Sequence, residues 1–476
     1  MRGVIEGFYG SPWSRAARLE VLEAIAGFGM NAYVYAPKSD PLHRDRWRDP
    51  YDDPQLAHFA DLAQRGDALG VRVGFAISPG VDIAYDRDAD RVAVLAKLTP
   101  LLDRGVDWFV LALDDIPARP GLGREHAALA GWLLDALRAA PGAASPELTL
   151  VPTEYVGTGS SPYLTELAAG LPESVAVMWT GTTVCSPTIT AAQARARAEA
   201  VGGRRPLVWD NFPVNDGPME RALHLGPYRG REPALAGEVS GVLCNPMIQP
   251  RASLVALATA ADWMRAPDRY DSDTAWTRAV DVVAAPDRRP ALRALAHACE
   301  DGPLCPPAET RVQRLVDRLG LGLEGDHAEA RDQLRELFDT VRTEGRAWAA
   351  EPDALGEEVA PWLAAARREA KAGLAALGLL DALDVQASAE DLLVHAFATL
   401  LAWGTARAGG EHLVFGPRFA VYPAVVQLTG GAPGLDVDLA VVEDASAIDR
   451  VCRHALRVYR HATPSPPDVA PGAPER

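Results

Sequence analysis

The feature that most constrains the fold is a regular alternation of strand-like and helix-like segments over the first 265 residues. Short runs rich in β-branched and aromatic residues predict eight strands, at Gly3–Glu6, Asn31–Tyr35, Val71–Ile77, Trp108–Leu113, Leu148–Val151, Val175–Trp179, Leu207–Trp209 and Ser240–Leu243. Segments with helical periodicity lie between them, at Arg15–Phe28, Pro54–Leu69, Ala89–Arg104, Arg124–Ala140, Pro162–Ala169, Ala191–Val201 and Ala252–Met264, with a poorly defined one near Met219–Leu225. Eight such units predict an α/β fold of the (β/α)8 TIM-barrel type. A doubly wound open sheet also alternates, but no G-x-G-x-x-G follows the first strand, so it is the weaker alternative.

The residue composition and periodicity of the sequence change after residue 265. Strand-like runs nearly vanish, and Ala-, Leu-, Glu- and Arg-rich segments with helical periodicity follow, at Arg289–Cys299, Glu309–Leu319, His327–Ala349, Pro361–Leu383 and Ala387–Leu401. Consecutive apolar helix faces usually bury one another, which predicts an all-α helical bundle. We therefore expect three parts: a barrel over 1–265, a helical domain over 266–462, and a disordered proline-rich tail over 463–476.

Charge and cysteine content exclude several classes of protein. Lys and Arg total 47 against 64 Asp and Glu, a net charge of −17, which disfavours attraction to nucleic acid or to anionic membranes. The uncharged stretch Ala252–Ala261 is too short to span a bilayer, and no secretory leader is recognisable at the start. Five scattered cysteines without a C-x-x-C pair are typical of reduced thiols. We expect a cytoplasmic protein with neither a nucleic-acid nor a membrane partner.

Polar and aromatic residues follow the predicted strands, where the active site of such a barrel lies. They are Glu6-Gly7-Phe8-Tyr9, Lys38, Asp114-Asp115, Glu154-Tyr155, Trp179-Thr180, Trp209-Asp210-Asn211, Asn215-Asp216 and Asn245. Aromatic faces stack on the C–H surfaces of sugars, while Asp and Asn hydrogen-bond hydroxyls. The mixture predicts a neutral, polyhydroxylated ligand.

The Asp114-Asp115 pair has two interpretations. Neighbours in a regular strand point to opposite faces, so Asp114 would face inward while Asp115 caps the next helix or turn. Both carboxylates reach the site only if the strand ends or bulges there, which Pro117 makes plausible. No histidine lies near these strand ends, and Asp/Asn clusters alone are a weak magnesium signal, so we predict no metal site.

The segments at the strand ends resemble glycoside hydrolase family 84, the β-N-acetylglucosaminidases that include protein O-GlcNAcases and bacterial relatives. The resemblance runs in order through residues 3–265 and is carried by nine segments: Gly3-Val-Ile-Glu-Gly-Phe-Tyr-Gly-Ser-Pro-Trp13, Asn31-Ala-Tyr-Val-Tyr-Ala-Pro-Lys38, Phe75-Ala-Ile-Ser-Pro-Gly80, Leu111-Ala-Leu-Asp-Asp-Ile116, Pro152-Thr-Glu-Tyr155, Met178-Trp-Thr-Gly181, Val208-Trp-Asp-Asn211, Leu225-Gly-Pro-Tyr228 and Gly241-Val-Leu-Cys-Asn-Pro246. It does not extend to specific residues of the helical region.

The resemblance implies a retaining, substrate-assisted glycosidase that forms an oxazoline and needs no cofactor. Asp114 would orient the substrate's acetamido N–H, and Asp115 would be the general acid and base, holding a proton near neutral pH. The remaining matches imply substrate-binding residues: Gly7, Tyr9, Lys38, Tyr155, Trp209, Asn211, Asp216 and Asn245.

The expected substrate is a terminal β-linked GlcNAc on a protein or a small glycoconjugate. Two alternatives stay open at this point: a GlcNAc-binding protein without turnover, and a hyaluronidase-like enzyme that digests polymers. If the protein forms a homodimer, we expect the helical domain to form the interface.

Overall fold

The structure is a computed structural model that describes residues 1–140, 145–300, 304, 310–320, 326–416, 427–431, 434–438 and 446–463. The chain divides into two compact units, Met1–Pro286 and Asp287–Arg476. The first unit extends past the predicted division at residue 265, because helix α8 (Ser272–Val283) packs against α7 (Pro250–Arg265). All of the predicted tail except Thr463 lies outside the described residues.

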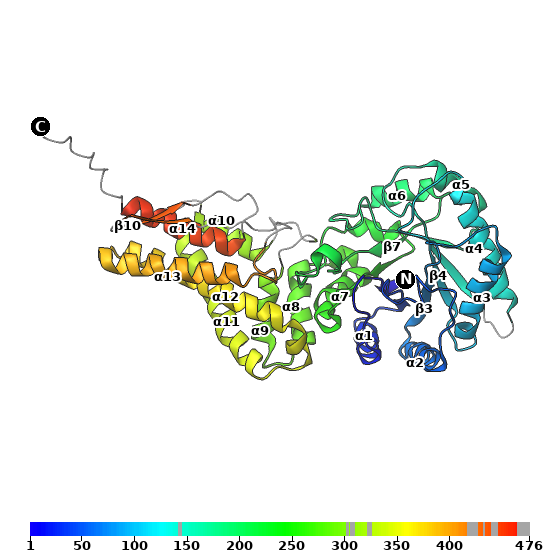
Figure 1. The fold of residues 1–476 in the computed structure, drawn as a ribbon, viewed down its shortest axis with the longest axis horizontal. Coiled ribbons are helices and arrows are strands. Elements are labelled where there is room, and N and C mark those ends of the chain that lie inside the picture. Colours follow the sequence, from blue (N-terminus) through cyan, green and yellow to red (C-terminus); the bar gives the residue numbers. More distant parts are fainter. Residues whose placement is uncertain are drawn as a thin grey trace, which may run out of the picture. The chain divides into compact units, whose positions relative to one another are not determined.

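The first unit is a closed barrel of eight parallel strands, in sequence order around the ring and with β1 paired to β8. The strands are β1 (Arg2–Glu6), β2 (Ala32–Tyr35), β3 (Arg72–Ile77), β4 (Trp108–Ala112), β5 (Glu147–Val151), β6 (Ala176–Trp179), β7 (Leu207–Asp210) and β8 (Gly241–Cys244). Helices surround them (Figure 1), namely α1 (Arg15–Gly27), α2 (Asp53–Leu69), α3 (Asp88–Leu102), α4 (Leu122–Ala139), α5 (Pro162–Gly170), α6 (Ala191–Ala200) and α7. The predicted barrel is confirmed.

Local sequence explains where these elements begin. The side chain of Ser14 accepts a hydrogen bond from the first turn of α1, and Ser161 does the same for α5. Asp52 with Gln55 and Thr190 with Gln193 form capping boxes at the starts of α2 and α6. Each cap satisfies backbone donors that have no partner inside the helix.

Side chains from every strand fill the barrel interior, among them Ile5, Val34, Ala76, Val110, Val151, Met178, Leu207 and Leu243. Trp108 is fully buried in this core and donates its indole N–H to Thr149 Oγ1 at 3.0 Å. The space it occupies depends on Gly74, where an added Cβ would lie 2.6 Å from Trp108 Cε3. A packed interior of this kind is a rigid support for the residues at the strand ends.

The connection between β7 and β8 departs from the predicted pattern. The sequence predicted a helix near Met219–Leu225, whereas the structure has only two 3-10 turns, η1 (Gly217–Met219) and η2 (Pro233–Gly237). Gly217-Pro218 and Gly226-Pro227 flank the predicted segment, and both residue types disfavour a helix that extends beyond it. A third 3-10 turn, η3 (Pro267–Arg269), follows α7.

The second unit is mainly helical. It contains α9 (Arg289–Ala298), α10 (Arg311–Gly320), α11 (Asp326–Ala350), α12 (Ala354–Asp384), α13 (Ala389–Ala408) and α14 (Ala447–Ala462). The long helix α12 packs against α11, α13 and α14. The sequence did not predict α14, nor the antiparallel pair β9 (Gln427–Gly431) and β10 (Gly434–Asp438).

A buried polar cluster joins three helices of this unit. Arg407 on α13 contacts Glu369 on α12 at 2.5 Å and Asp449 on α14 at 3.3 Å. Trp403 donates its indole N–H to Asp449 at 2.7 Å. Burial is the main reason that the pKa of Glu369 rises to about 7. Within the described residues, no helix is long and apolar enough to cross a membrane.

Candidate active site

A cavity of about 150 Å³ opens at the carboxyl ends of the barrel strands. All ten residues that the sequence predicted for the site line it: Gly7, Tyr9, Lys38, Asp114, Asp115, Tyr155, Trp209, Asn211, Asp216 and Asn245. Four further lining residues were not named by sequence reasoning: Val151, Val184, Cys185 and Val214. Thr180 also lines the cavity and was named only as a polar residue at a strand end. Val151 ends β5, so its place at a strand end could have identified it as well.

Both adjacent carboxylates face this cavity, which decides between the two interpretations of the pair. Strand β4 ends at Ala112, and Asp115 adopts the left-handed conformation with φ of 55°. The change of backbone direction removes the strand alternation that would have separated the two side chains. Helix α4 is capped by Gly121 rather than by Asp115.

Asp114 is paired on one oxygen only. Its Oδ2 accepts a hydrogen bond from Lys38 Nζ at 2.5 Å, and both side chains are almost completely buried. Its Oδ1 is buried and has no hydrogen-bond partner among the described residues. Because a buried acceptor without a donor is costly, this oxygen is the natural partner for an N–H or O–H of a ligand.

Asp115 is more exposed and is held by two phenols. Tyr9 donates to Oδ2 at 2.7 Å, and Tyr155 donates to Oδ1 at 2.9 Å. Partial burial disfavours the charged form of Asp115, but these two bonds and the charges of Lys38 and Arg44 outweigh it and lower its pKa. Because the phenols stabilise the carboxylate, the proton expected on Asp115 near neutral pH requires a change in these surroundings.

Trp209 forms one wall of the cavity and depends on Gly7. An added Cβ at Gly7 would lie 2.2 Å from Trp209 Cζ2, so only glycine permits this position of the indole. Trp209 donates its N–H to Asn211 Oδ1 at 3.0 Å. Asn245 donates to the same oxygen at 2.9 Å and accepts from the Gly7 N–H at 3.1 Å. Asn211 in turn donates to the Val184 carbonyl at 2.7 Å, so both amide side chains have fixed orientations.

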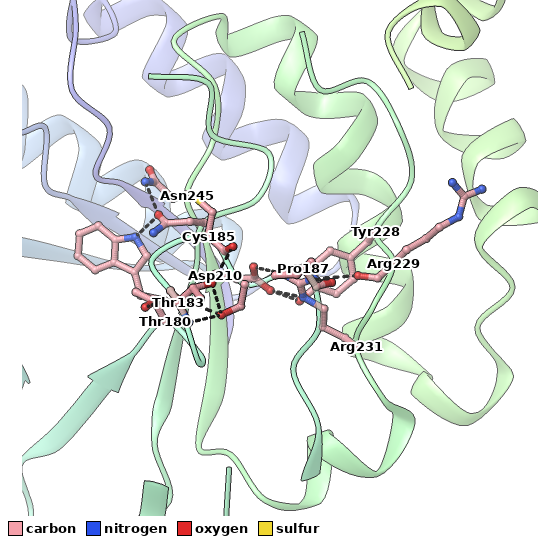
Figure 2. A network of polar contacts seen from close by, with 12 residues as sticks. Thr180, Thr183, Cys185, Pro187, Asp210, Tyr228, Arg229, Arg231 and Asn245 are labelled. Atoms are coloured by element: carbon pink, nitrogen blue, oxygen red, sulfur yellow. Dashed lines mark hydrogen bonds and ion pairs between the residues drawn. The ribbon is translucent and has the colours of Figure 1, made fainter. Parts of the chain in front are cut away.

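Asp210, between Trp209 and Asn211, belongs to a buried network rather than to the cavity. Figure 2 shows its carboxylate facing Arg231 and Tyr228. Arg231 Nε donates to Oδ2 at 2.9 Å, Arg231 Nη2 pairs with Oδ1, and the Tyr228 hydroxyl donates to Oδ2 at 2.5 Å. The side chains of Asp210 and Arg231 are 1% and 4% exposed. Every oxygen of this carboxylate is therefore occupied by protein.

Glu6, at the end of β1, is saturated in the same way. Arg18 binds it through Nε and Nη2 at 2.8 and 2.9 Å, the Tyr33 hydroxyl donates to Oε2, and the backbone N–H of Trp13 donates to Oε1 at 3.2 Å. Glu6 is completely buried. It joins the barrel end to α1 and leaves no acceptor for a ligand.

Asp216 lies on the loop after β7 and contacts the β1 end. Its Oδ2 accepts the Tyr9 backbone N–H at 2.7 Å. Partial burial, together with the charge of Asp115, raises the pKa of Asp216 above its usual value. The neighbouring Asn215 is buried and fixes this loop, since it donates to Ala222 O and to Gln249 Oε1.

Two free cysteines lie at or near this end of the barrel. Cys185 lines the cavity, and burial raises the pKa of its thiol to about 11. Cys244, at the end of β8, is completely buried. Among the residues that the structure describes, no group of three or more His, Cys, Asp and Glu side chains is placed to hold a metal ion.

Comparison with known proteins places this geometry in a family. The model of the beta-N-acetylglucosaminidase family matches residues 2–297. The protein O-GlcNAcases of Rattus norvegicus and Mus musculus are each 32% identical to the chain over 279 residues, which is 55% of the chain. The match spans only 30% of the length of these curated relatives.

Two solved structures are similar over most of the chain. One is an aspartate-to-asparagine mutant of the Thermobaculum terrenum O-GlcNAc hydrolase, with a TM-score of 0.78 and 26% identity over 97% of this chain and 94% of that one. The other is CpGH84B, with a TM-score of 0.79 and 28% identity over 87% of this chain and 74% of that one. The match to the family model covers more than half of the chain and includes every residue that lines the cavity. The chain therefore belongs to the beta-N-acetylglucosaminidase family, glycoside hydrolase family 84.

Proposed function

We propose that the protein is an exo-acting, retaining β-N-acetylglucosaminidase that removes terminal β-linked GlcNAc through an oxazoline intermediate. Membership of the family supports the hydrolysis of GlcNAc glycosides. The small cavity, lined by Trp209 and by the two carboxylates, suits one sugar ring better than a length of polymer. It therefore favours action at a chain end.

The observation that carries the mechanism is the asymmetry of Asp114. Lys38 balances its charge on one oxygen, while the other oxygen is buried without a protein partner. An acetamido N–H would satisfy this acceptor. As the acetamido group attacks, positive charge develops on its nitrogen, and a fixed carboxylate stabilises that charge without reorganising.

The two steps then use the substrate's own nucleophile. The acetamido carbonyl oxygen bonds to C1 of the sugar, the bond from C1 to the leaving oxygen breaks, and Asp115 gives its proton to that oxygen. Water then adds to C1 and gives a proton to Asp115, while the bond from C1 to the oxazoline oxygen breaks and restores the acetamide. Two displacements at C1 retain its configuration.

Substrate binding also favours the uptake by Asp115, from solvent, of the proton that general acid catalysis needs. The Tyr155 O–H donates either to Asp115 or to the acetamido oxygen, because a hydroxyl has one proton to donate. When the acetamido oxygen takes this donor, Asp115 loses part of what holds its pKa down, and expulsion of water disfavours its charge further. Binding thus prepares the general acid.

The remaining residues bind and orient the sugar. Trp209 walls the acetamide side, and Asn211 offers its remaining N–H near it. Gly7, Tyr9 and Lys38 contact ring hydroxyls from the β1 and β2 ends. Asp216 and Asn245 hold the outer hydroxyls, and the raised pKa of Asp216 suits a group that can donate or accept.

The test is hydrolysis of an aryl N-acetyl-β-glucosaminide, with the anomer formed first identified by NMR. We expect turnover with retention, and a rate that falls steadily as fluorine replaces hydrogen in the acetamido methyl, because fluorine weakens the carbonyl nucleophile. A rate indifferent to fluorination would contradict the oxazoline. Binding of GlcNAc without hydrolysis would support the sugar-binding alternative, and loss of hyaluronan viscosity would support a polymer hydrolase.

For the natural aglycone we propose only a class: a protein or a small glycoconjugate. The relatives are named for O-GlcNAc, but the chain matches less than a third of their length. Cytoplasmic localisation and a homodimer through the helical domain stay predictions.

A further inference from the structure

A line of hydrogen bonds behind the cavity ends at the backbone that carries the two carboxylates. It begins at Tyr85 in the loop after β3, passes through His126 on α4 and Tyr163 on α5, and reaches Thr153 after β5. Thr153 Oγ1 then donates to the carbonyl of Leu113, the residue before Asp114. The sequence analysis assigned no role to His126.

Each bond in this line has good geometry. His126 Nε2 lies 2.8 Å from the Tyr85 hydroxyl, and Nδ1 lies 2.9 Å from the Tyr163 hydroxyl. The Thr153 N–H donates to the Tyr163 hydroxyl at 3.0 Å, and Thr153 Oγ1 donates to Leu113 O at 2.7 Å. His126 is completely buried, and Tyr85 and Tyr163 are nearly so. The arrangement is therefore a closed part of the core.

The donors and acceptors fix the roles of the imidazole. Burial lowers the pKa of His126 to about 3, so the ring is neutral throughout the working range. The Tyr163 oxygen already accepts from Thr153, and its own O–H needs an acceptor, for which His126 Nδ1 is placed. We therefore assign the proton to Nε2, which donates to Tyr85.

We propose that His126 is a positioning residue: by accepting a hydrogen bond from the Tyr163 hydroxyl it fixes Thr153, and through Thr153 it sets the Tyr155–Asp115 hydrogen bond. Thr153 lies two residues before Tyr155 and bonds to the residue before Asp114, so it ties together the backbone segments that carry both partners. The bond between Leu113 N and Val151 O, at 2.9 Å, joins the same two segments one step earlier.

The effect on catalysis rests on the proposed function, because only there does Asp115 act as acid and base. The groups that face Asp115 are Tyr9, Tyr155, Lys38, Arg44, Asp114 and Asp216. Of these, Asp114 and Tyr155 lie on the two backbone segments that this line of bonds joins, and Tyr155 is the one that donates to Asp115. A displaced Tyr155 donates less well to Asp115 in the free enzyme and to the acetamido oxygen in the complex.

Two substitutions of His126 separate its bond to Tyr163, the inner bond, from its bond to Tyr85, the outer bond. An asparagine amide oxygen can take the place of Nδ1, so His126→Asn keeps the acceptor for Tyr163. A glutamine amide nitrogen reaches the place of Nε2, so His126→Gln keeps only the bond to Tyr85. Tyr163→Phe removes the inner bonds directly, and Tyr85→Phe is the matched control, because it removes only the outer bond.

We expect His126→Asn and Tyr85→Phe to keep kcat within about twofold, while His126→Gln and Tyr163→Phe lower kcat about tenfold and change KM less than about twofold. In the impaired pair, the basic limb of the kcat/KM profile should move to higher pH, since Asp115 loses a donor. Crystal structures of the four variants should show the Tyr155–Asp115 bond lost in that pair and kept in the other.

The proposal is overturned if His126→Gln and Tyr163→Phe keep that bond, or if activity in all four variants simply follows the melting temperature. If the unmodified protein hydrolyses no N-acetyl-β-glucosaminide, the proposed function fails. The positioning role is then still judged, because the four structures report the Tyr155–Asp115 distance without any turnover.

Discussion

The carboxylates at the β4 and β7 ends of the barrel have opposite environments although each follows a buried apolar strand. Arg231 and Tyr228 occupy both oxygens of Asp210. At β4, Asp114 keeps one oxygen without a partner among the described residues, and Asp115 accepts hydrogen bonds from two phenols, each of which can donate to a ligand instead. A saturated carboxylate stabilises the fold, whereas an unsaturated one is available for chemistry.

The largest effect should come from Asp115→Asn. We expect kcat for an alkyl N-acetyl-β-glucosaminide to fall by about 10² to 10⁴, because general acid and base catalysis contributes that much. The melting temperature should change little, since Asp115 is exposed. Asp135→Asn, an exposed change on α4, is the control and should leave both values unchanged. An active Asp115→Asn enzyme would remove the distinction between the two strand ends.

Asp210→Asn should mainly lower stability, whereas Asp115→Asn should mainly lower kcat. Removing one partner of a buried ion pair leaves Arg231 uncompensated, which typically costs about 3–5 kcal/mol in the free energy of unfolding. Chemical denaturation measures it. Asp107→Asn, which breaks a partly exposed pair with Arg72, is the matched control at about 0–1 kcal/mol. Equal losses in the two variants would show that the β7 network stabilises no more than a surface pair.

Gly7→Ala tests the cavity wall that Trp209 forms at the β7 end. The new Cβ would overlap Trp209, and relieving such overpacking costs about 1–3 kcal/mol. We expect the indole to move away from Asn211, so KM should rise about tenfold or more while kcat changes less. Inhibitor binding by calorimetry provides an independent readout. Unchanged affinity for a GlcNAc-derived thiazoline would show that Trp209 does not form the acetamide wall.

The smallest effect should be a shift in pH dependence in Tyr9→Phe. This change removes one donor to the Asp115 carboxylate, so the pKa of Asp115 rises. The protonated acid then survives to higher pH, and the basic limb of kcat/KM should move up by about half a unit to one unit. Pro218→Ala, on the loop after Asp216, is a control outside the hydrogen-bond network. A downward shift would mean that Asp115 is not the acid.

Sequence reasoning predicted the barrel well because each unit has its own local signal. The strands are continuous apolar runs, and caps such as Asp52 and Thr190 mark where helices begin. It failed between β7 and β8, where the apolar spacing resembled a helix but Gly-Pro pairs at both ends leave too short a segment for a stable one. It also missed α14, although Ile448, Val451, Cys452, Ala455 and Leu456 recur at helical spacing and are buried.

The sequence was enough to predict which residues line the site, but not their hydrogen-bond partners or their protonation. Strand-end position and family resemblance brought together ten residues that do line one cavity. Neither could show that Glu6 and Asp210 are saturated while Asp114 is not, because saturation depends on partners such as Arg18 and Arg231 from other elements. The lowered pKa of Asp115 likewise follows from phenols on β1 and β5 segments, which no local pattern reveals.

The hydrogen bonds that complete the cavity wall have a consequence for the order of events during synthesis. Gly7 bonds to Asn245, 238 residues away, and Tyr9 bonds to Asp216, 207 residues away. Contacts this distant in sequence form only after the intervening chain has been made and ordered. A nascent chain that has released β1 to β7 from the ribosome therefore has both carboxylates but no site. The glycosidase activity that we propose should therefore appear only with the eighth strand, and its onset would time the closure of the barrel.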